Sequence, residues 1–226
     1  MNKILPNILN SGQDEDTAIT IPDNCKINYF ELKKLVNETS EKLIDHGAQN
    51  EKPIVIVLKN NAEFIITFLA VTNTSAIAAP LNSGFTEEEF NFYLDDINPS
   101  MVITTEGNLV IKQAKSKNIA VSIVSFENGI LKMDFDSNKV NKKDTNRPNE
   151  NNSCLFLHTS GTTSRPKGVP LKHKNLLESL KNIVDTYDLK NTDKMINLIL
   201  LMFENRNQIK KIIFFKNIKL KNIQLN

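Results

Sequence analysis

The sequence is poor in cysteine, since Cys25 and Cys154 are the only two among 226 residues and lie far apart. Two isolated thiols form no CxxC pair and offer too few ligands for a structural zinc site. Unpaired thiols of this kind are typical of reduced cysteines in a cytosolic protein. We therefore predict no metal-ligating residues in the chain.

Long hydrophobic runs are also absent. No stretch of about 18 apolar residues occurs, so no transmembrane helix is expected. The first residues, MNKILPNILNSGQDED, contain one lysine and a short apolar patch interrupted by Pro6, without the apolar core of a secretory signal. The net charge of +2 gives no support for a nucleic-acid partner. We predict a cytoplasmic protein with no membrane span and no nucleic-acid partner.

The end of the chain differs in composition from the rest, which is ordinary for a globular protein at 40% hydrophobic and 24% charged residues. Asn, Ile and Lys dominate residues 197–226, which contain no Gly, Pro, Ala, Val, Asp, Ser or Thr. We predict that residues 196–226 form an aberrant or disordered tail. A frameshift, an unspliced intron and a genuine divergent end are the alternatives for its origin.

Apolar runs alternate with helical patterns over residues 27–124. The run Ile54–Leu58 is apolar throughout, which is typical of a parallel strand buried on both faces. Gly47 is a helix C-cap, and Thr86 and Glu89 form a capping box. The expected strands are Ile27–Tyr29, Ile54–Leu58, Ala76–Pro80, Met101–Thr104 and Ile119–Val124, with helices between them. This alternation predicts an α/β fold with a doubly wound, mostly parallel sheet.

The chain is predicted to divide at a polar stretch. Residues 1–137 form a first α/β subdomain, and residues 138–152 are a linker with almost no apolar anchors. Residues 153–195 contain a strand, a Ser/Thr/Gly-rich loop and a helix that open a second subdomain. We expect the loop-bearing strand to belong to a second sheet.

The loop TSGTTSRPKG combines features that suit an anion. It follows an apolar strand and precedes a helix, and α/β folds bind ligands at the carboxyl ends of strands. Glycines let the backbone approach an anion, hydroxyls donate to phosphate oxygens, and a lysine adds positive charge. The candidate phosphate-binding residues are Thr159, Ser160, Gly161, Thr162, Thr163, Ser164, Lys167 and Gly168.

The loop is not the phosphate-binding motif of ATPases and GTPases. That motif requires G-x-x-x-x-G-K-[ST], and counting from Gly161 its second glycine would fall at Pro166. No G-x-G-x-x-G occurs either, so a dinucleotide-binding fold has no support. The alternative is an exposed Ser/Thr-rich turn before a proline.

With its flanking residues, the loop resembles the signature loop of the AMP-forming adenylating enzymes, which include acyl-CoA synthetases, luciferases and peptide-synthetase adenylation domains. The resemblance extends over residues 18–195 and includes NYFEL at 28–32, LKNNAEF at 58–64, APLN at 79–82 and EEFNFYLD at 88–95. His158, Ser164-Arg165 and Pro170-Leu171 look like the oxalate–CoA ligase subgroup, also described as peroxisomal CoA synthetases. The resemblance implies the N-terminal part of the large domain of an acyl-CoA synthetase.

The reaction implied by this resemblance has two halves. A carboxylate attacks the α-phosphate of Mg-ATP to give an acyl-adenylate, and CoA then displaces AMP to form a thioester. By resemblance, Thr159–Gly168 holds the β- and γ-phosphates, and Lys167 is the catalytic residue that neutralises charge on the leaving group. The implied partners are a small carboxylic acid, oxalate above all, with ATP, Mg²⁺ and CoA. Magnesium and CoA are expected to bind through parts that this chain lacks.

Several family features do not appear. They include a Tyr-Gly-x-Thr-Glu stretch and a late lysine on a lid domain, so we expect this truncated chain alone to have little or no ligase activity. A non-catalytic nucleotide-binding or interaction protein and another adenylating class are the alternatives. Full-length relatives can be peroxisomal, but the visible end, Gln224-Leu225-Asn226, is no peroxisomal address.

Two histidines close to the loop lead to different expectations. His158 either stacks near the nucleotide, lines the acid pocket, or fills space at the end of its strand. His173 has no carboxylate nearby in the sequence, and we expect it at the surface.

Overall fold

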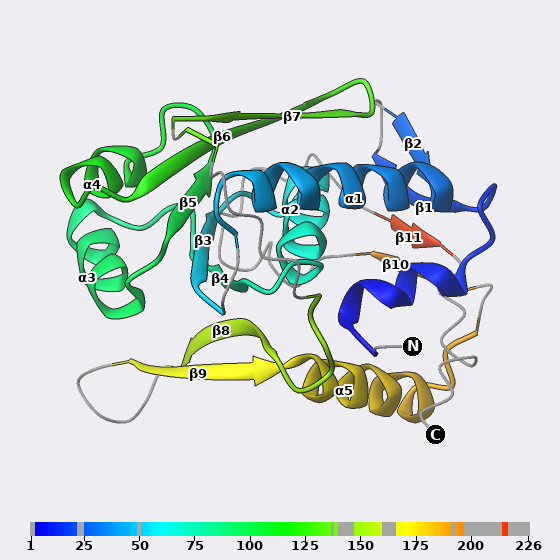
Figure 1. Ribbon diagram of the computed structural model, residues 1–226. Helices are drawn as coiled ribbons and strands as arrows, with labels where there is room; N and C mark the ends of the chain where they lie inside the picture. The colour runs from blue at the N-terminus through cyan, green and yellow to red at the C-terminus, as the bar shows by residue number, and fades with distance from the viewer. Residues whose placement is uncertain are drawn as a thin grey trace.

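The computed structural model describes residues 3–21, 25–48, 51–136, 138–139, 147–159, 166–190, 193–196 and 214–216 (Figure 1). Residues 160–165, in the middle of the predicted phosphate loop, lie outside these ranges. The elements in chain order are η1 (Leu5–Ser11), β1 (Thr17–Ile21), β2 (Cys25–Asn28), α1 (Tyr29–Asp45), β3 (Pro53–Val57), α2 (Ala62–Thr72), β4 (Ile77–Pro80), α3 (Glu87–Ile97), β5 (Met101–Thr104), α4 (Val110–Ser116), β6 (Ala120–Glu127), β7 (Ile130–Phe135), β8 (Ser153–Thr159), β9 (Lys167–Lys172), α5 (His173–Thr186), β10 (Lys194–Ile196) and β11 (Phe214–Lys216).

A seven-stranded sheet forms the centre of the described molecule. Its strand order is β7-β6-β5-β3-β4-β8-β9. The pairs β6–β5, β5–β3, β3–β4 and β4–β8 are parallel, whereas β7 and β9 run antiparallel at the two edges. The predicted α/β fold with a mostly parallel sheet is therefore confirmed.

Strand β3 is buried on both faces because its residues are apolar without alternation. Ile54 and Ile56 pack in one cluster with α1 and α2, while Val55 and Val57 pack in a second cluster with α3 and α4. In Figure 1 the two helix pairs lie on opposite sides of β3 and β5. Helices on both faces are what the predicted doubly wound arrangement requires.

The ends of the helices follow the predicted capping residues. Thr86 and Glu89 form the capping box of α3, and Gly47, with φ of 93°, follows the last turn of α1. Asn28 gives α1 a capping box with Glu31 that was not predicted. The expected strand Ile27–Tyr29 is thus wrong at its end, because Tyr29 is already helical.

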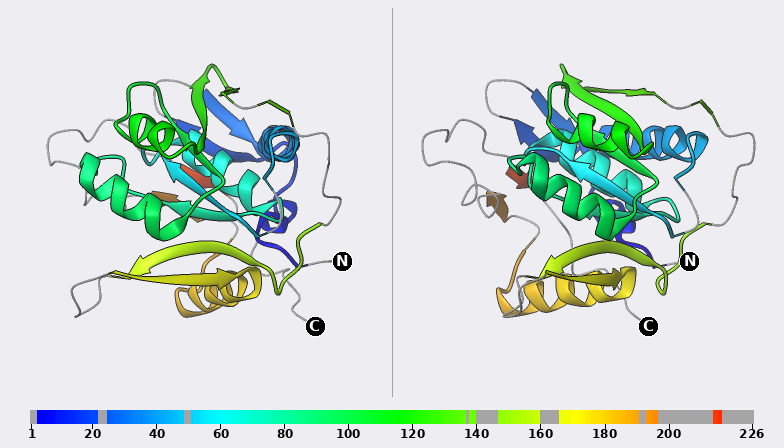
Figure 2. Two further views of the ribbon diagram at one scale, coloured as in Figure 1. Left: turned by 60° about the vertical axis from the view of Figure 1, so that its left-hand side comes forward. Right: turned by 90° about the vertical axis from the view of Figure 1, so that its left-hand side faces the viewer.

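The loop-bearing strand is not in a second sheet. β8 pairs in parallel with β4, and β9 folds back on β8 as an antiparallel hairpin. Figure 2 shows this hairpin below the other strands of the sheet, with α5 next to it. The expectation of a second sheet was wrong because a hairpin supplies its own partner strand and needs only one neighbour to join the existing sheet.

Five strands of the structure were not predicted from the sequence, namely β1, β7, β9, β10 and β11. β1 and β2 form an antiparallel pair, β7 pairs with β6 through the turn Asn128–Gly129, and β9 was interpreted as part of the loop. The predicted domain boundaries remain a prediction. Within residues 196–226, the structure describes Ile196 and residues 214–216, and β11 pairs with β1 and with β10. No helix among the described residues is long and apolar enough to cross a membrane.

Candidate functional site

A cavity of about 550 Å³ lies where β3, β4 and β8 end. Because these strands are parallel, their carboxyl ends meet at one edge of the sheet, where α/β folds bind ligands. The lining residues are Leu58, Lys59, Asn60, Phe64, Pro80, Leu81, Asn82, Ser83, Phe85, Tyr93, Leu157, His158, Thr159 and Pro166. The described lining combines aromatic and aliphatic groups with amides, hydroxyls and one lysine, and it contains no carboxylate.

Thr159 and Lys167 form the base of the predicted phosphate loop. They are register partners across the hairpin, and the Thr159 hydroxyl donates to the Lys167 carbonyl oxygen over 3.4 Å. The other predicted site residues Ser160, Gly161, Thr162, Thr163 and Ser164 lie outside the described residues. The structure therefore places the two ends of the loop beside the cavity.

Gly168 has a role in packing. A Cβ atom at this position would lie 2.2 Å from Cζ of Phe156, so only glycine lets the aromatic ring lie against this part of β9. His158, the register partner of Gly168, is on the same strand as Phe156. The close contact explains a glycine here without any reference to a ligand.

His158 is held by three neighbours. Its Nε2 lies 2.8 Å from Oδ2 of Asp96, in the last turn of α3. An ionised carboxylate only accepts hydrogen bonds, so Nε2 carries the proton and donates. The imidazole also meets the rings of Tyr93 and Phe156 edge to face, at centroid distances of 4.8 and 5.3 Å. Its side chain is 7% exposed and forms part of the cavity wall.

His173 is not at the surface, contrary to expectation. It is 1% exposed, and its Nδ1 accepts a hydrogen bond from the Leu5 N–H over 3.0 Å. Burial lowers the pKa of His173 to about 4, because desolvation disfavours the charged imidazolium. No local sequence pattern marks this contact, because Leu5 and His173 are 168 residues apart.

Cys154 is a core residue of β8. It is fully buried, and burial raises the pKa of its thiol to about 12. A thiol in this environment is protonated and unreactive at neutral pH.

Sequence reasoning missed most of the cavity wall. Phe64, Phe85 and Tyr93 were not predicted as site residues, and neither was Asp96, which contacts the wall residue His158. The positions of Phe64 and Phe85 could have been inferred from the topology, because both lie in segments that follow β3 and β4, two parallel strands whose ends meet.

The family profile described as "AMP-binding enzyme" matches residues 10–205, which include the whole hairpin and the cavity. The chain belongs to the AMP-binding enzyme family. An oxalate–CoA ligase of Arabidopsis thaliana is 34% identical over 210 residues, covering 90% of this chain and 40% of the relative. An oxalate–CoA ligase of Saccharomyces cerevisiae is 28% identical and covers 80% of this chain, which spans 39% of that relative.

Solved structures agree with this AMP-binding enzyme fold. MatB from Rhodopseudomonas palustris superimposes with a TM-score of 0.70 at 20% identity, over 85% of this chain and 39% of that protein. A structure of the same MatB with ATP bound gives a TM-score of 0.67. At this identity the likeness concerns the fold, and it confirms the expected N-terminal part of the large domain. The chain spans about two fifths of the length of these relatives.

The described part of the site fits a polyphosphate. Thr159 places a hydroxyl at the end of a parallel strand, and Lys167, opposite to it, is exposed and forms no ion pair with another described residue. An exposed ammonium group and a cavity wall without carboxylates favour an anion. The described residues thus form a side of the cavity that is free of carboxylates and lies beside an exposed lysine.

Proposed function

We propose that this AMP-binding enzyme chain is the N-terminal part of an ATP-dependent acid–CoA ligase that forms an acyl-adenylate and then a CoA thioester, with oxalate as the acid. The observation that carries the proposal is the hairpin β8–β9, since Thr159 and Pro166, the described residues on either side of the loop, line a cavity at the carboxyl edge of the sheet. The choice of oxalate is supported by the 34% identity to the Arabidopsis enzyme and by His158, Ser164-Arg165 and Pro170-Leu171.

Each end of the loop has a distinct task in this proposal. Lys167 neutralises charge that builds up on the pyrophosphate leaving group, and Thr159 donates to a phosphate oxygen. Both residues lie on strands, so their backbone positions are fixed before the nucleotide arrives. A preorganised charge of this kind costs little reorganisation at the moment of reaction.

We further propose that the chain alone has little or no ligase activity. Catalysis requires that acid, adenine, ribose and magnesium are held together with the phosphates. Magnesium would bind to the phosphate oxygens, and CoA would enter only after adenylation, so neither is assigned to a residue of this chain. The described residues provide phosphate contacts and one cavity wall only.

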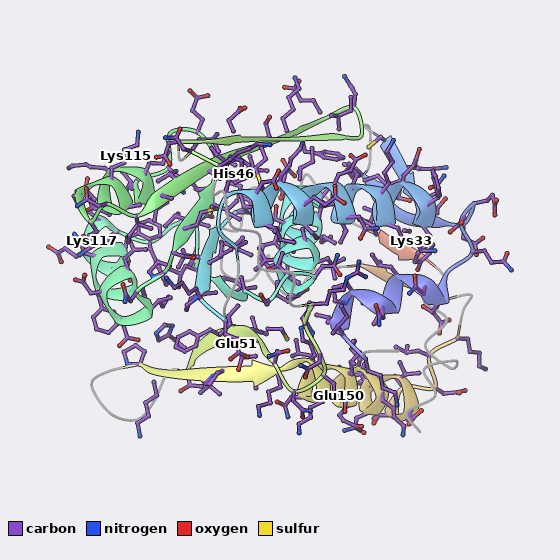
Figure 3. The ribbon with its side chains drawn as sticks, in the orientation of Figure 1. Lys33, His46, Glu51, Lys115, Lys117 and Glu150 are labelled. Carbon is purple, nitrogen blue, oxygen red and sulfur yellow. The ribbon has the colours of Figure 1, made fainter. Side chains whose placement is uncertain are left out.

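Equilibrium binding of Mg-ATP, followed by isothermal titration calorimetry on the full chain, tests the phosphate site. Lys167→Ala is expected to weaken binding about 10- to 100-fold, because a charge-assisted hydrogen bond contributes about 1.5–3 kcal/mol. Lys115→Ala is the matched control, since Lys115 is an equally exposed lysine on α4 (Figure 3). Equal affinity of wild type and Lys167→Ala would contradict the proposed role of Lys167.

Pyrophosphate release tests the reaction and the acid. With Mg-ATP and oxalate, the chain alone is expected to fall far below the usual enzyme range of about 1–1000 turnovers per second. Turnover within that range would contradict the proposed inactivity. Residual turnover that depends on malonate, acetate or an amino acid, but not on oxalate, would contradict oxalate as the acid.

A further inference from the structure

The hydrogen bond between His158 and Asp96 lies beyond the point where the backbone pairing of β8 with β4 has ended. The ladder between β4 and β8 consists of one register pair, Ala78 with Leu155. β4 ends at Pro80, which has no N–H to donate. From residue 156 onward, side chains make the described contacts between β8 and the elements other than its hairpin partner β9.

The hydrogen bond and a ring contact of His158 lead to α3. Phe156 and His158 point to the same side of β8, because residues two apart on a strand share a face. His158 touches Tyr93 and is hydrogen-bonded to Asp96, one turn further along the helix. Phe156 contacts His158 on one side and the backbone of Gly168 on the other. The contacts thus continue from α3 through β8 to β9.

Asp96 occupies a position that is unfavourable for a carboxylate. It is in the last turn of α3, where the partial negative charge of the helix end disfavours an anion. A hydrogen bond from His158 offsets this cost. A locally unfavourable residue with one specific partner is expected at a site where geometry matters for function.

We propose that His158 and Asp96 are positioning residues for the phosphate loop, in that their hydrogen bond fixes the end of β8 against α3 and so places Thr159 and Lys167 for the triphosphate of Mg-ATP. This inference rests on the proposed function. His158 directly precedes Thr159, and Gly168 directly follows Lys167. The two ends of the loop are therefore each one residue away from the group of contacts with α3.

The test separates the hydrogen bond from the aromatic packing. His158→Phe keeps a ring but removes the donor, whereas His158→Gln keeps an N–H donor near the position of Nε2. Asp96→Asn removes the charge of the acceptor. Mg-ATP affinity is expected to fall about 10-fold in His158→Phe and in Asp96→Asn, and less than about 3-fold in His158→Gln. The double variant Asp96→Asn/His158→Phe is expected to bind no more weakly than either single variant, because both remove one interaction.

Asp95→Asn provides the matched control. Asp95 is the preceding residue of the same helix turn, and it pairs with Lys117 after α4 instead of with the hairpin. Figure 3 shows Lys117 beside α3 and α4, away from β8 and β9. Both substitutions remove one carboxylate charge from the end of α3, so a general electrostatic effect would appear in both. We expect unchanged Mg-ATP affinity in Asp95→Asn.

Hydrogen exchange of the hairpin amides distinguishes positioning from direct contact with the nucleotide. Without nucleotide, amides in Ser153–Thr159 and Lys167–Lys172 are expected to exchange faster in Asp96→Asn and His158→Phe than in Asp95→Asn. Weaker Mg-ATP binding with unchanged exchange would mean that His158 contacts the ligand itself, and would overturn the positioning role.

The outcomes for this inference and for the proposed function differ. If wild type binds Mg-ATP and Lys167→Ala weakens it, but His158→Phe and Asp96→Asn bind like wild type, the inference fails and the phosphate site stands. If wild type does not bind Mg-ATP, the proposed function fails and the inference fails with it.

Discussion

Strand β3 in the middle of the sheet has four of its five residues buried, whereas five of the six residues of β9 at the edge are exposed. β3 has four register pairs with β4 and four with β5, while β8 joins β4 through one pair. The centre is thus stabilised by apolar burial on both faces, which is not directional. The hairpin that bears the loop depends on a few directional contacts.

The difference follows from what each region has to do. A parallel sheet centre needs only apolar residues on every strand, and many sequences satisfy this requirement. A ligand loop must end in a particular place, within fractions of an ångström, and a small number of hydrogen bonds and ring contacts can fix such a position. Single substitutions in the hairpin should therefore change local order and ligand binding more than global stability.

The largest effect is expected in the centre. Phe90 of α3 is fully buried between the helix and the sheet, so Phe90→Ala should lower the free energy of unfolding by about 3–5 kcal/mol. Urea denaturation followed by circular dichroism measures it. Phe92→Ala, on the same helix, is the control because that ring is 38% exposed. Similar losses in both variants would contradict the assignment of Phe90 to the core.

His173 should make stability depend on pH. Its pKa is about 4 in the folded chain against an ordinary value of 6.5, so the unfolded state binds more protons between these values. The contribution of His173 to the free energy of unfolding should thus be fully present above pH 6.5 and should decrease as the pH falls toward 4. The total loss should reach about 3 kcal/mol.

His173→Asn isolates this contribution, because an amide oxygen can still accept the Leu5 N–H but does not titrate in this range. Urea denaturation at several pH values between 4.5 and 7.5 compares the two proteins. The wild type should lose more stability toward low pH than the variant. Parallel curves would show that His173 is solvated in the folded state.

The sequence predicted the central strands of the sheet best, because the signals that mark them are local. Continuous apolar runs such as Ile54–Leu58 are determined by burial, and capping residues such as Thr86 and Glu89 act within four residues. Both signals are local, so the central strands β3, β4, β5 and β6 and the α/β class were predicted correctly.

The hairpin and the cavity depend on long-range pairs. Asp96 and His158 are 62 residues apart, and Leu5 and His173 are 168 apart, so no local pattern marks either pair. β9 was missed because Gly168 and Pro170 are unfavourable within a strand, and only the ring of Phe156 and the edge position explain them. The phosphate loop is predicted from its motif, whereas the residues proposed to position it could be recognised only in the fold.

A substitution of Gly168 tests how tightly the hairpin is packed. Gly168→Ala brings a methyl group to 2.2 Å from Phe156 Cζ, so the ring or the strand must move, at a cost of about 1–3 kcal/mol. Thermal unfolding measures the loss, and hydrogen exchange should locate it in β8 and β9. The added substitution Phe156→Ala should reduce the effect of Gly168→Ala. Gly84→Ala is the control, since its added Cβ would meet only Asn82 Oδ1 at 3.5 Å.

The smallest effect is expected for Glu51, which precedes β3 and is hydrogen-bonded to the start of β8. Its Oε1 accepts from Asn152 Nδ2 over 3.0 Å and from the Ser153 N–H over 3.2 Å, and Figure 3 shows Glu51 beside the hairpin. Glu51→Ala removes both bonds at an exposed position, so global stability should fall by about 0.5–1.5 kcal/mol. Hydrogen exchange at Ser153–Thr159 should increase, with no change in β3.

Glu150→Ala is the control, because it also removes one carboxylate close to the hairpin. The hydrogen bond that Glu150 accepts from the Lys174 N–H is made by its backbone carbonyl and is kept in the variant. If Glu51→Ala instead raised exchange in β3 as much as in β8, the hairpin and the sheet centre would open as one unit. The contrast between a core held by burial and an edge held by single contacts would then be wrong, and the tie at Glu51 would stabilise the whole sheet.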